Sequence, residues 1–195
     1  MQKTFIEILR SSVDERRTLF ETVAAHLGTQ APNIEKDLYV CWVLDFLFNR
    51  RPNDPVGLYF KGGTSLSKAY GLVRRFSEDI DIGMYKADLH VPLEADIAAL
   101  PSVNQQQRAL AEKVDEAARQ YISGPLRELL TSELAIVEEA AGRPGHFSLG
   151  FGFDLYRNKE ALDILVLGYK SVFESAGSYV QAAVRIEGGA HPDPE

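Results

Sequence analysis

The sequence contains few cysteine and histidine residues, which form disulfide bonds and structural metal sites. Cys41 is the single cysteine among 195 residues, which excludes an internal disulfide bond and is typical of a reducing cytoplasm. Four scattered histidines and one cysteine do not form a zinc-binding pattern. No apolar run is long enough to span a membrane, and residues 1–10 contain Glu7 and lack the apolar core of a signal peptide. We therefore expect a cytoplasmic globular protein that does not associate with a membrane.

Basic residues are also scarce relative to acidic ones. The 21 lysines and arginines are outnumbered by 28 aspartates and glutamates, so the formal net charge is −7. This balance argues against a surface that binds nucleic acid over its whole extent, although it permits a local basic groove. Hydrophobic residues make up 45% of the chain and charged residues 25%, as in ordinary globular proteins. The pattern Gly-x-x-x-x-Gly-Lys-Ser/Thr is absent from the sequence, which argues against a P-loop enzyme.

The order of helix and strand patterns predicts an α+β protein with a mixed sheet flanked by helices. Helices are expected at residues 14–27, 32–48, 103–121 and 122–141. Strands are expected at residues 58–60, 79–82, 147–156, 161–169 and 179–187, and residues 85–100 are predicted to be irregular. We expect residues 1–195 to form a single domain, with N-terminal helices in residues 1–50 and the core sheet with its helices in residues 56–195.

A glycine turn follows the first predicted strand and precedes a short predicted helix. Gly62 and Gly63 allow the backbone to turn sharply and to approach a ligand closely. Thr64 or Ser65 is suited to cap a helix at residues 66–72. The N–H groups and the dipole of a helix N-terminus favour phosphate, so the turn predicts a phosphate cradle. A capped turn without a ligand is the alternative, because motifs this short often arise by coincidence.

Several basic residues surround this turn in the sequence, namely Lys61, Lys68, Arg74 and Arg75. Lys68 falls about one turn into the predicted helix, where its ammonium faces either the phosphates or the solvent. Arg74 and Arg75 lie near the end of that helix, where the helix dipole favours them without any ligand. Lys68 is therefore the candidate phosphate ligand among the four.

Asp79 and Asp81 alternate with Ile80 and Ile82, which predicts a strand whose carboxylates share one face while its isoleucines face the core. Two adjacent carboxylates repel each other and favour a bound cation. Mg²⁺ is bound by a few carboxylates together with water and substrate phosphates, and two such ions promote in-line displacement at phosphorus. The alternative is a solvent-facing aspartate pair at a strand edge. Beside the glycine turn, the pair predicts a site for a metal-bound nucleoside triphosphate.

These motifs resemble those of the DNA polymerase β-type nucleotidyltransferase superfamily, and more closely those of the AbiEii/AbiGii toxin family of type IV toxin–antitoxin systems. The likeness rests on Lys-Gly-Gly-Thr-Ser-Leu-Ser-Lys-Ala-Tyr-Gly at residues 61–71 and on Ser-Glu-Asp-Ile-Asp-Ile at residues 77–82. Residues 34–48 resemble the N-terminal helix of the family, and residues 179–189 resemble the strand that follows its central hairpin.

The resemblance implies a polymerase β-like nucleotidyltransferase fold, a Mg²⁺ or Mn²⁺ cofactor and an NTP donor. It also implies an RNA acceptor, in characterised relatives the 3′ end of tRNA, and a cognate antitoxin protein as a partner. By the same resemblance Asp79 and Asp81 hold the metal together with a third carboxylate, for which Glu187 is the first candidate and Asp163 the second. The nucleotide-binding candidates lie in the glycine turn and the helix after it: Gly62, Gly63, Thr64, Ser65 and Lys68.

Members of the family normally continue into a helical C-terminal region that supplies a further catalytic lysine and an acidic residue. No matching segment is found before Glu195, so we expect a nucleotidyltransferase that lacks this region. The chain is then a fragment, a naturally short member, or a sequence whose resemblance to the family does not extend to the C-terminus. Two other interpretations stay open: a nucleotide-binding or protein-interaction module without catalysis, and a kinase-like enzyme that transfers the γ-phosphoryl group. Release of pyrophosphate, binding without turnover, and release of a nucleoside diphosphate would distinguish the three.

Overall fold

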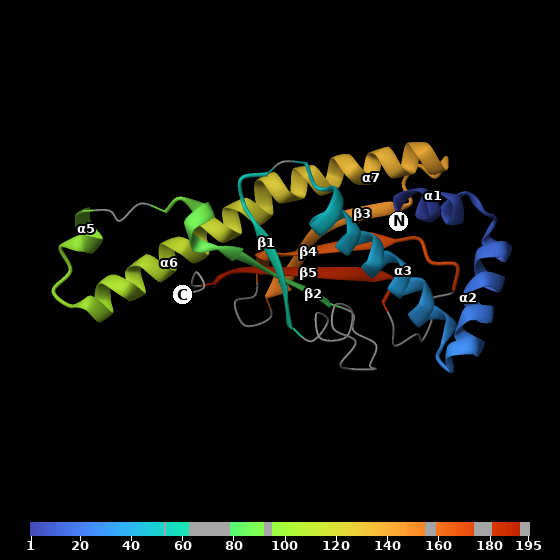
Figure 1. Ribbon diagram of the computed structural model, residues 1–195, viewed down its shortest axis with the longest axis horizontal. Helices are drawn as coiled ribbons and strands as arrows, with labels where there is room; N and C mark the ends of the chain where they lie inside the picture. The colour runs from blue at the N-terminus through green and yellow to red at the C-terminus, as the bar shows by residue number, and fades with distance from the viewer. Residues whose placement is uncertain (53, 63–78, 92–94, 155–158, 174–180, 192–195) are drawn as a thin grey trace.

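The computed structural model describes all of the chain except residues 53, 63–78, 92–94, 155–158, 174–180 and 192–195 (Figure 1). Its α-helices are α1 (Gln2–Arg10), α2 (Val13–Leu27), α3 (Ala31–Asp45), α5 (Ala95–Ala98), α6 (Val103–Tyr121) and α7 (Arg127–Ala141). Tighter or wider helical turns are η1 (Phe46–Arg50), η2 (Lys86–Leu89) and η3 (Ile122–Leu126). The strands are β1 (Leu58–Lys61), β2 (Asp79–Tyr85), β3 (Phe147–Asp154), β4 (Lys159–Tyr169) and β5 (Ala183–His191).

The described strands form one five-stranded sheet in the order β1-β2-β5-β4-β3. β2 and β5 run parallel, whereas the other neighbouring pairs are antiparallel. This mixed sheet with its helices confirms the predicted α+β class. β5 begins at Ala183 rather than at residue 179 and continues through His191, so that it pairs with all of β2. The region predicted to be irregular contains η2 and α5, both of which are only four residues long.

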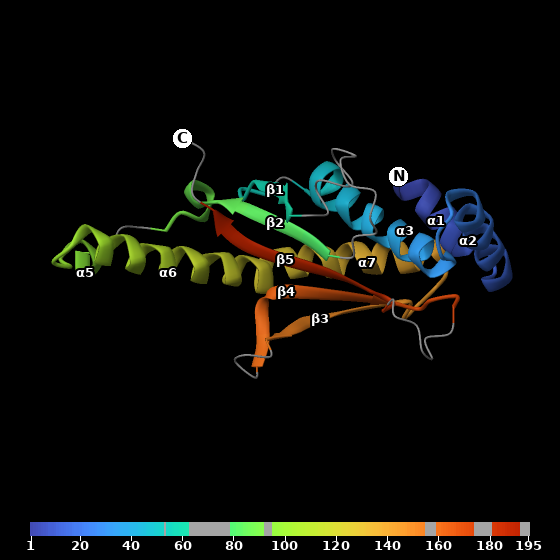
Figure 2. The ribbon, with the colours of Figure 1, turned by 90° about the horizontal axis from the view of Figure 1, so that it is seen from below.

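Figures 1 and 2 show α6, η3 and α7 as one nearly continuous rod along the long axis of the molecule. Pro125 lies inside η3, where the sequence predicts regular helix. Because proline has no backbone N–H group, the rod continues through a wider π-helical turn at this point. α5 and the start of α6 extend past the strands in both views. None of the helices in the described ranges has both the length and the apolar character needed to cross a membrane.

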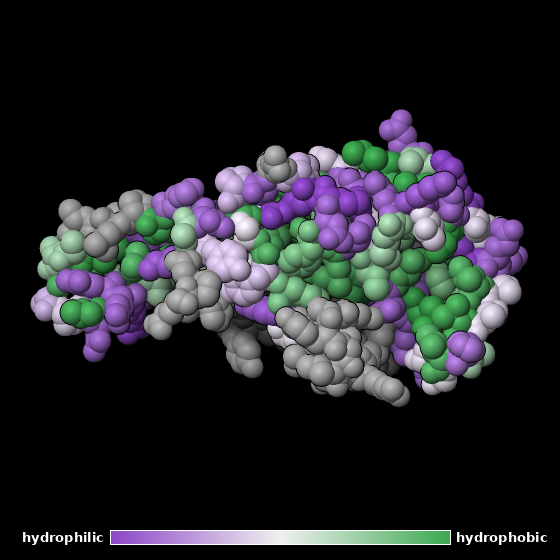
Figure 3. Space-filling view, in the orientation of Figure 1, coloured by the Kyte–Doolittle hydropathy of each residue, from purple (hydrophilic) through white to green (hydrophobic). Residues whose placement is uncertain are grey.

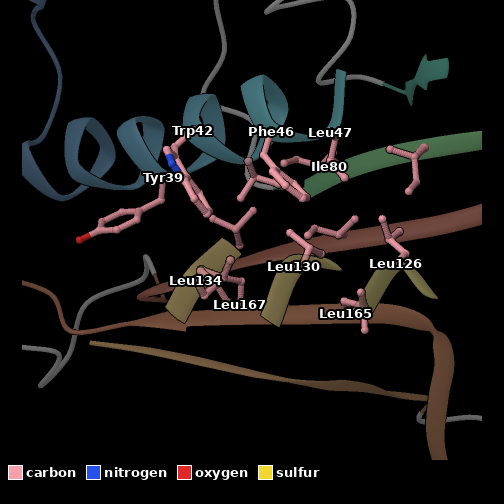
Figure 4. Close-up of a cluster of buried hydrophobic side chains, with 14 of the residues drawn as sticks. Tyr39, Trp42, Phe46, Leu47, Ile80, Leu126, Leu130, Leu134, Leu165 and Leu167 are labelled. Atoms are coloured by element: carbon pink, nitrogen blue, oxygen red, sulfur yellow. The ribbon is translucent and has the colours of Figure 1, made fainter. Parts of the chain in front are cut away.

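The hydrophobic core lies between one face of the sheet and the layer formed by α3 and the rod (Figure 4). α3 contributes Trp42 and the turn η1 that follows it contributes Phe46. α7 contributes Leu130, and the strands contribute Ile80 and Leu165. Each of these side chains is at most 2% exposed. Since side chains alternate between the two faces of a strand, the polar residues of β2 and β5 lie on the opposite face of the sheet.

α1 is a helix that is not predicted from the sequence. Its buried residues, Phe5 and Leu9, lie one turn apart and are at most 1% exposed. The ring of Phe5 stacks on Trp42 with 5.0 Å between the ring centroids. The guanidinium of Arg143 donates a hydrogen bond to the carbonyl oxygen of Leu9 at 3.0 Å, so α1 is fastened to the end of α7. No side-chain N-cap marks the start of α1, which leaves its sequence signal weak.

α2 begins one residue before the predicted helix at residues 14–27 and ends with it. Arg16, Phe20 and Ala24 are its buried residues. Leu19 and Leu27 are large hydrophobic residues of the same helix that remain 41% and 64% exposed. Figure 3 shows hydrophobic residues gathered where α2 ends and α3 begins, at the lower right of the view. The buried face of α2 is polar at Arg16 because this residue joins a buried polar network.

The buried polar network joins α3 to His146, just before β3, and to the segment after β4, and the charge of Arg16 in α2 acts on it. The hydroxyl group of Tyr39 and Nε2 of His146 are 2.8 Å apart, and the carboxylate of Glu35 accepts a hydrogen bond from the N–H of Val172 at 2.9 Å. Burial raises the pKa of Glu35, although Arg16 and the hydrogen bonds to the carboxylate partly offset this. Burial, reinforced by the positive charge of Arg16, lowers the pKa of His146 to about 4.

The close contact at Gly188 generates a first prediction. A Cβ atom on Gly188 would lie 2.3 Å from Cδ1 of Ile122, which is fully buried in the core. We expect Gly188→Ala to reduce the free energy of unfolding by about 1–3 kcal/mol, because overpacking forces the strand or Ile122 to shift. Urea denaturation measures this change. Gly150→Ala is the matched control, since a Cβ at Gly150 in the same sheet would meet no atom within 4 Å, and equal losses in both variants would contradict the prediction.

A second prediction concerns His146 and pH. The folded-state pKa of about 4 lies below the ordinary value of 6.5, so the unfolded chain binds the proton more readily. Stability is therefore expected to be full above about pH 6.5 and to fall as the pH drops toward 4, by roughly 2 kcal/mol at pH 5. Urea unfolding at a series of pH values should show a shallower loss for His146→Gln. His26→Gln, at an exposed position of α2, should keep the wild-type slope; identical slopes for all three proteins would refute this assignment.

Candidate functional site

β2 presents Asp79 and Asp81 on the face of the sheet opposite to the core. Ile80, Ile82 and Met84 alternate with the two aspartates and are fully buried. Asp79 is exposed, whereas Asp81 is half-buried. The alternation in the sequence therefore corresponds to an alternation in space, with the isoleucines anchoring the strand and the carboxylates directed away from the core.

β5 places Glu187 beside Asp81. In the parallel pairing of the two strands, Glu187 is opposite Asp81 and Arg185 is opposite Asp79. Neighbouring strands lie about 4.8 Å apart, so the side chains of these pairs are direct neighbours on one face of the sheet. Ile164 of β4 is opposite Glu187 on its other side.

Asp163, the second candidate for a third carboxylate, lies next to Ile164 in β4. β4 is separated from β2 by β5, so Asp163 lies one strand further from Asp81 than Glu187 does. The pairing register therefore favours Glu187 over Asp163 as the carboxylate that joins the aspartate pair.

The carboxylates disturb one another electrostatically. The pKa of Asp81 is raised above its ordinary value, first because the side chain is partly removed from water and then because Glu187 and Asp79 are negatively charged. Lys61 and Arg185 oppose this rise through their positive charges. A cation bound among the three carboxylates would relieve the same repulsion.

Lys61 and Arg185 are two neighbours of Asp81 that are not among the site residues predicted from the sequence. Lys61 ends β1 and is opposite Asp81 in the antiparallel pairing with β2. Nη2 of Arg185 donates to Oε2 of Glu187 at 3.2 Å. The Arg-Ile-Glu alternation in β5 is visible in the sequence, but the identity of the neighbouring strand is set by tertiary pairing.

The glycine turn begins at Gly62, directly after β1. Gly62 has φ of +74°, in the left-handed region that favours glycine, and a Cβ here would lie 1.9 Å from Oδ2 of Asp81. The absence of a side chain therefore lets the chain pass close over the carboxylate of Asp81. The remaining predicted members of the cradle lie outside the described residues: Gly63, Thr64, Ser65, Lys68 and the helix expected at residues 66–72.

Carboxylate oxygens from Asp79, Asp81 and Glu187 are the type of donor that Mg²⁺ and Mn²⁺ prefer. Within the described ranges, no group of three or more His, Cys, Asp or Glu side chains is already arranged to hold a metal ion. Glu187 is paired with Arg185, so it would have to exchange this partner for the ion. The donor chemistry and the raised pKa of Asp81 nevertheless fit a divalent cation.

A family model described as the nucleotidyl transferase AbiEii toxin of type IV TA systems matches residues 45–195. The match includes every described strand and all of the predicted site residues, whereas α1, α2 and nearly all of α3 precede it. No curated protein and no solved structure matches the chain.

The crowding of carboxylates around Asp81 generates a third prediction. In metal-free buffer at pH 7 we expect Asp81→Asn to melt at the wild-type temperature or up to about 2 °C higher, because it removes a charge whose ionised form is disfavoured in the folded protein. Differential scanning calorimetry measures this. Added Mn²⁺ should raise the melting temperature of the wild type but not of the variant, since a ligand of the folded state stabilises it.

The control for this measurement is Asp115→Asn, at an exposed position of α6. It should respond to Mn²⁺ as the wild type does. If Asp81→Asn melts far below the wild type, or if it keeps the full response to Mn²⁺, then Asp81 is a structural residue and does not hold a metal.

Proposed function

Because this chain belongs to the AbiEii family of nucleotidyl transferase toxins of type IV toxin–antitoxin systems, we propose that it transfers a nucleotide from an NTP to an acceptor hydroxyl group. The proposal assigns Asp79, Asp81 and Glu187 as ligands of a divalent metal, Mg²⁺ or Mn²⁺. It assigns the glycine turn, from Gly62 to Ser65, together with Lys68, to the triphosphate.

The observation that supports this assignment best is the position of Asp81. It lies opposite Glu187 on a parallel neighbouring strand, two residues from Asp79 on the same face, and directly below the turn at Gly62. The start of the glycine turn thus lies against Oδ2 of Asp81, which is itself part of the carboxylate cluster. This supports the proposal, because a metal-bound triphosphate needs carboxylates for the ion and hydrogen-bond donors for the phosphates.

In the proposed reaction the acceptor hydroxyl oxygen forms a bond to the α-phosphorus of the NTP. The bond from the α-phosphorus to the oxygen that bridges to the β-phosphate breaks, pyrophosphate leaves, and the hydroxyl proton is lost to solvent or to a nearby base. A bound divalent ion supplies charge neutralisation at the phosphate oxygens. The role of Asp79, Asp81 and Glu187 is to fix the position of the ion, and the role of the turn is to align the triphosphate for in-line attack.

We propose RNA as the acceptor, with the 3′ end of tRNA as the first candidate on the basis of the family resemblance, and the cytoplasm as the compartment. The net charge of −7 makes a broad RNA-binding surface unfavourable, so the acceptor end is expected to enter near the basic residues around the glycine turn. A cognate antitoxin protein is the proposed partner, since the family belongs to two-component toxin–antitoxin systems.

The proposal is tested by incubating the protein with each α-³²P-labelled NTP, Mg²⁺ or Mn²⁺, and total tRNA. We expect label to enter RNA with release of pyrophosphate. Asp81→Asn and Glu187→Gln should lower the rate by about 100-fold or more, because each removes a charge that positions the ion. Asp163→Asn is the matched control in the neighbouring strand and should retain most of the activity.

Other products would overturn the proposal in defined ways. Transfer of γ-label in place of α-label would identify a phosphotransferase. Metal-dependent NTP binding without incorporation into any RNA would identify a binding module. Loss of activity in Asp163→Asn, with full activity in Glu187→Gln, would assign the third carboxylate to β4.

A further inference from the structure

Lys61 has a position that the proposed metal site does not explain. It is the last residue of β1, opposite Asp81 of β2, yet its Nζ lies 3.6 Å from the point where a Cβ on Gly189 would be. Gly189 belongs to β5, on the far side of β2 (Figure 2). The lysine side chain therefore extends across β2 toward β5, over the same face of the sheet that carries the carboxylates.

Two glycines make room for this arrangement. Gly83 of β2 is opposite Gly189 of β5, so the sheet next to the Asp81 and Glu187 pair lacks side chains on both strands. A Cβ at Gly83 would lie 1.9 Å from Cζ of Tyr59, which shows that the Tyr59 ring lies on the backbone there. Tyr59 and Lys61 thus lie on one face of β1, and their side chains cover Gly83 and Gly189.

Lys61 also differs from Arg185 in its ion pairing. Arg185 is engaged by Glu187 at 3.2 Å. No carboxylate of the described residues lies within ion-pair distance of Lys61, although its charge acts on Asp81. The ammonium of Lys61 therefore lies beside the carboxylate cluster and partly balances its charge, without forming an ion pair with a carboxylate of the described residues. This leaves its N–H donors suited to a phosphate oxygen.

We propose that Lys61 is a phosphate-binding residue that contacts the β- or γ-phosphate of the bound nucleoside triphosphate. The inference rests on the proposed function, since the ligand is the same NTP. A triphosphate held by an ion on Asp81 would lie near β2, which is the strand that the lysine crosses. A compact ammonium group neutralises phosphate charge and stabilises the charge that develops on leaving pyrophosphate. Gly189 keeps this position open, since a Cβ there would meet only Nζ of Lys61, at 3.6 Å.

The test compares Lys61→Met with Lys86→Met. Both lysines are half-buried, and Lys86 lies in η2, beyond the end of β2. Calorimetric titration of Mg²⁺-ATP, Mg²⁺-GTP, Mg²⁺-CTP and Mg²⁺-UTP should show that Lys61→Met weakens binding of the preferred nucleotide by about 10- to 100-fold, the range expected for a hydrogen bond to a charged group. Lys86→Met should bind like the wild type.

Titration with Mn²⁺ alone separates phosphate binding from support of the carboxylates. Lys61→Met should bind Mn²⁺ as tightly as the wild type or more tightly, because it removes a positive charge near Asp81. An equal loss of Mn²⁺ and NTP binding would overturn the proposal, since Lys61 would then act by organising the carboxylates. NTP binding unchanged from the wild type would overturn it as well.

A second variant keeps Lys61 but fills the space that its side chain occupies. Gly189→Leu should displace the ammonium from the sheet and weaken NTP binding to a similar degree, which also covers the case in which Lys61→Met fails to fold. If Gly189→Leu folds and binds NTP like the wild type, the proposal is wrong. Failure of the proposed function is distinct, because the wild type itself would then bind no NTP with Mg²⁺, or Asp81→Asn would bind it normally.

Discussion

The parallel pairing of β2 with β5 is the constraint on which the rest of the site depends. It joins strands that are separated in the chain by α5, α6, α7, β3 and β4. The register puts Asp81 beside Glu187 while Ile80 and Ile186 face the core and are fully buried. A slip by one residue would turn Glu187 into the core and expose Ile186. The burial of two isoleucines therefore holds the two carboxylates next to each other.

The helical layer packs against the core face of the sheet and stabilises this register, while the carboxylates of the site destabilise it. Ile122 of the π-helical turn packs against the backbone at Gly188, and Leu130 of α7 is fully buried in the same core. On the other face, the charges of Asp79 and Glu187 raise the pKa of Asp81, so the folded state holds these carboxylates against their mutual repulsion. Hydrophobic burial on one face thus offsets electrostatic repulsion on the other.

Local patterns predict much of the fold, and less of the site. The alternation in residues 79–82 predicts both the strand and the face of its carboxylates, and α6 has the predicted bounds. α1 escapes prediction because Phe5 and Leu9 form a short pattern without a side-chain N-cap. In the site, the sequence predicts Lys61 only as a member of a basic cluster around a turn. Its position opposite Asp81 depends on strand order, which is set by tertiary contacts and is not encoded in any local period.

Gly188 and Gly189 are consecutive residues of β5, of which the first faces the core and the second faces the site. Successive residues of a strand face opposite sides of a sheet, so the two missing side chains serve different surfaces. At Gly188 the space is filled from the core by Ile122, whereas at Gly189 it is approached by the ammonium of Lys61. A single pair of glycines therefore allows the helical layer to press close against β5 on one face and leaves the other face flat beside Glu187. On that face the ammonium of Lys61, together with the ring of Tyr59 on the neighbouring Gly83, lines the surface next to the carboxylates.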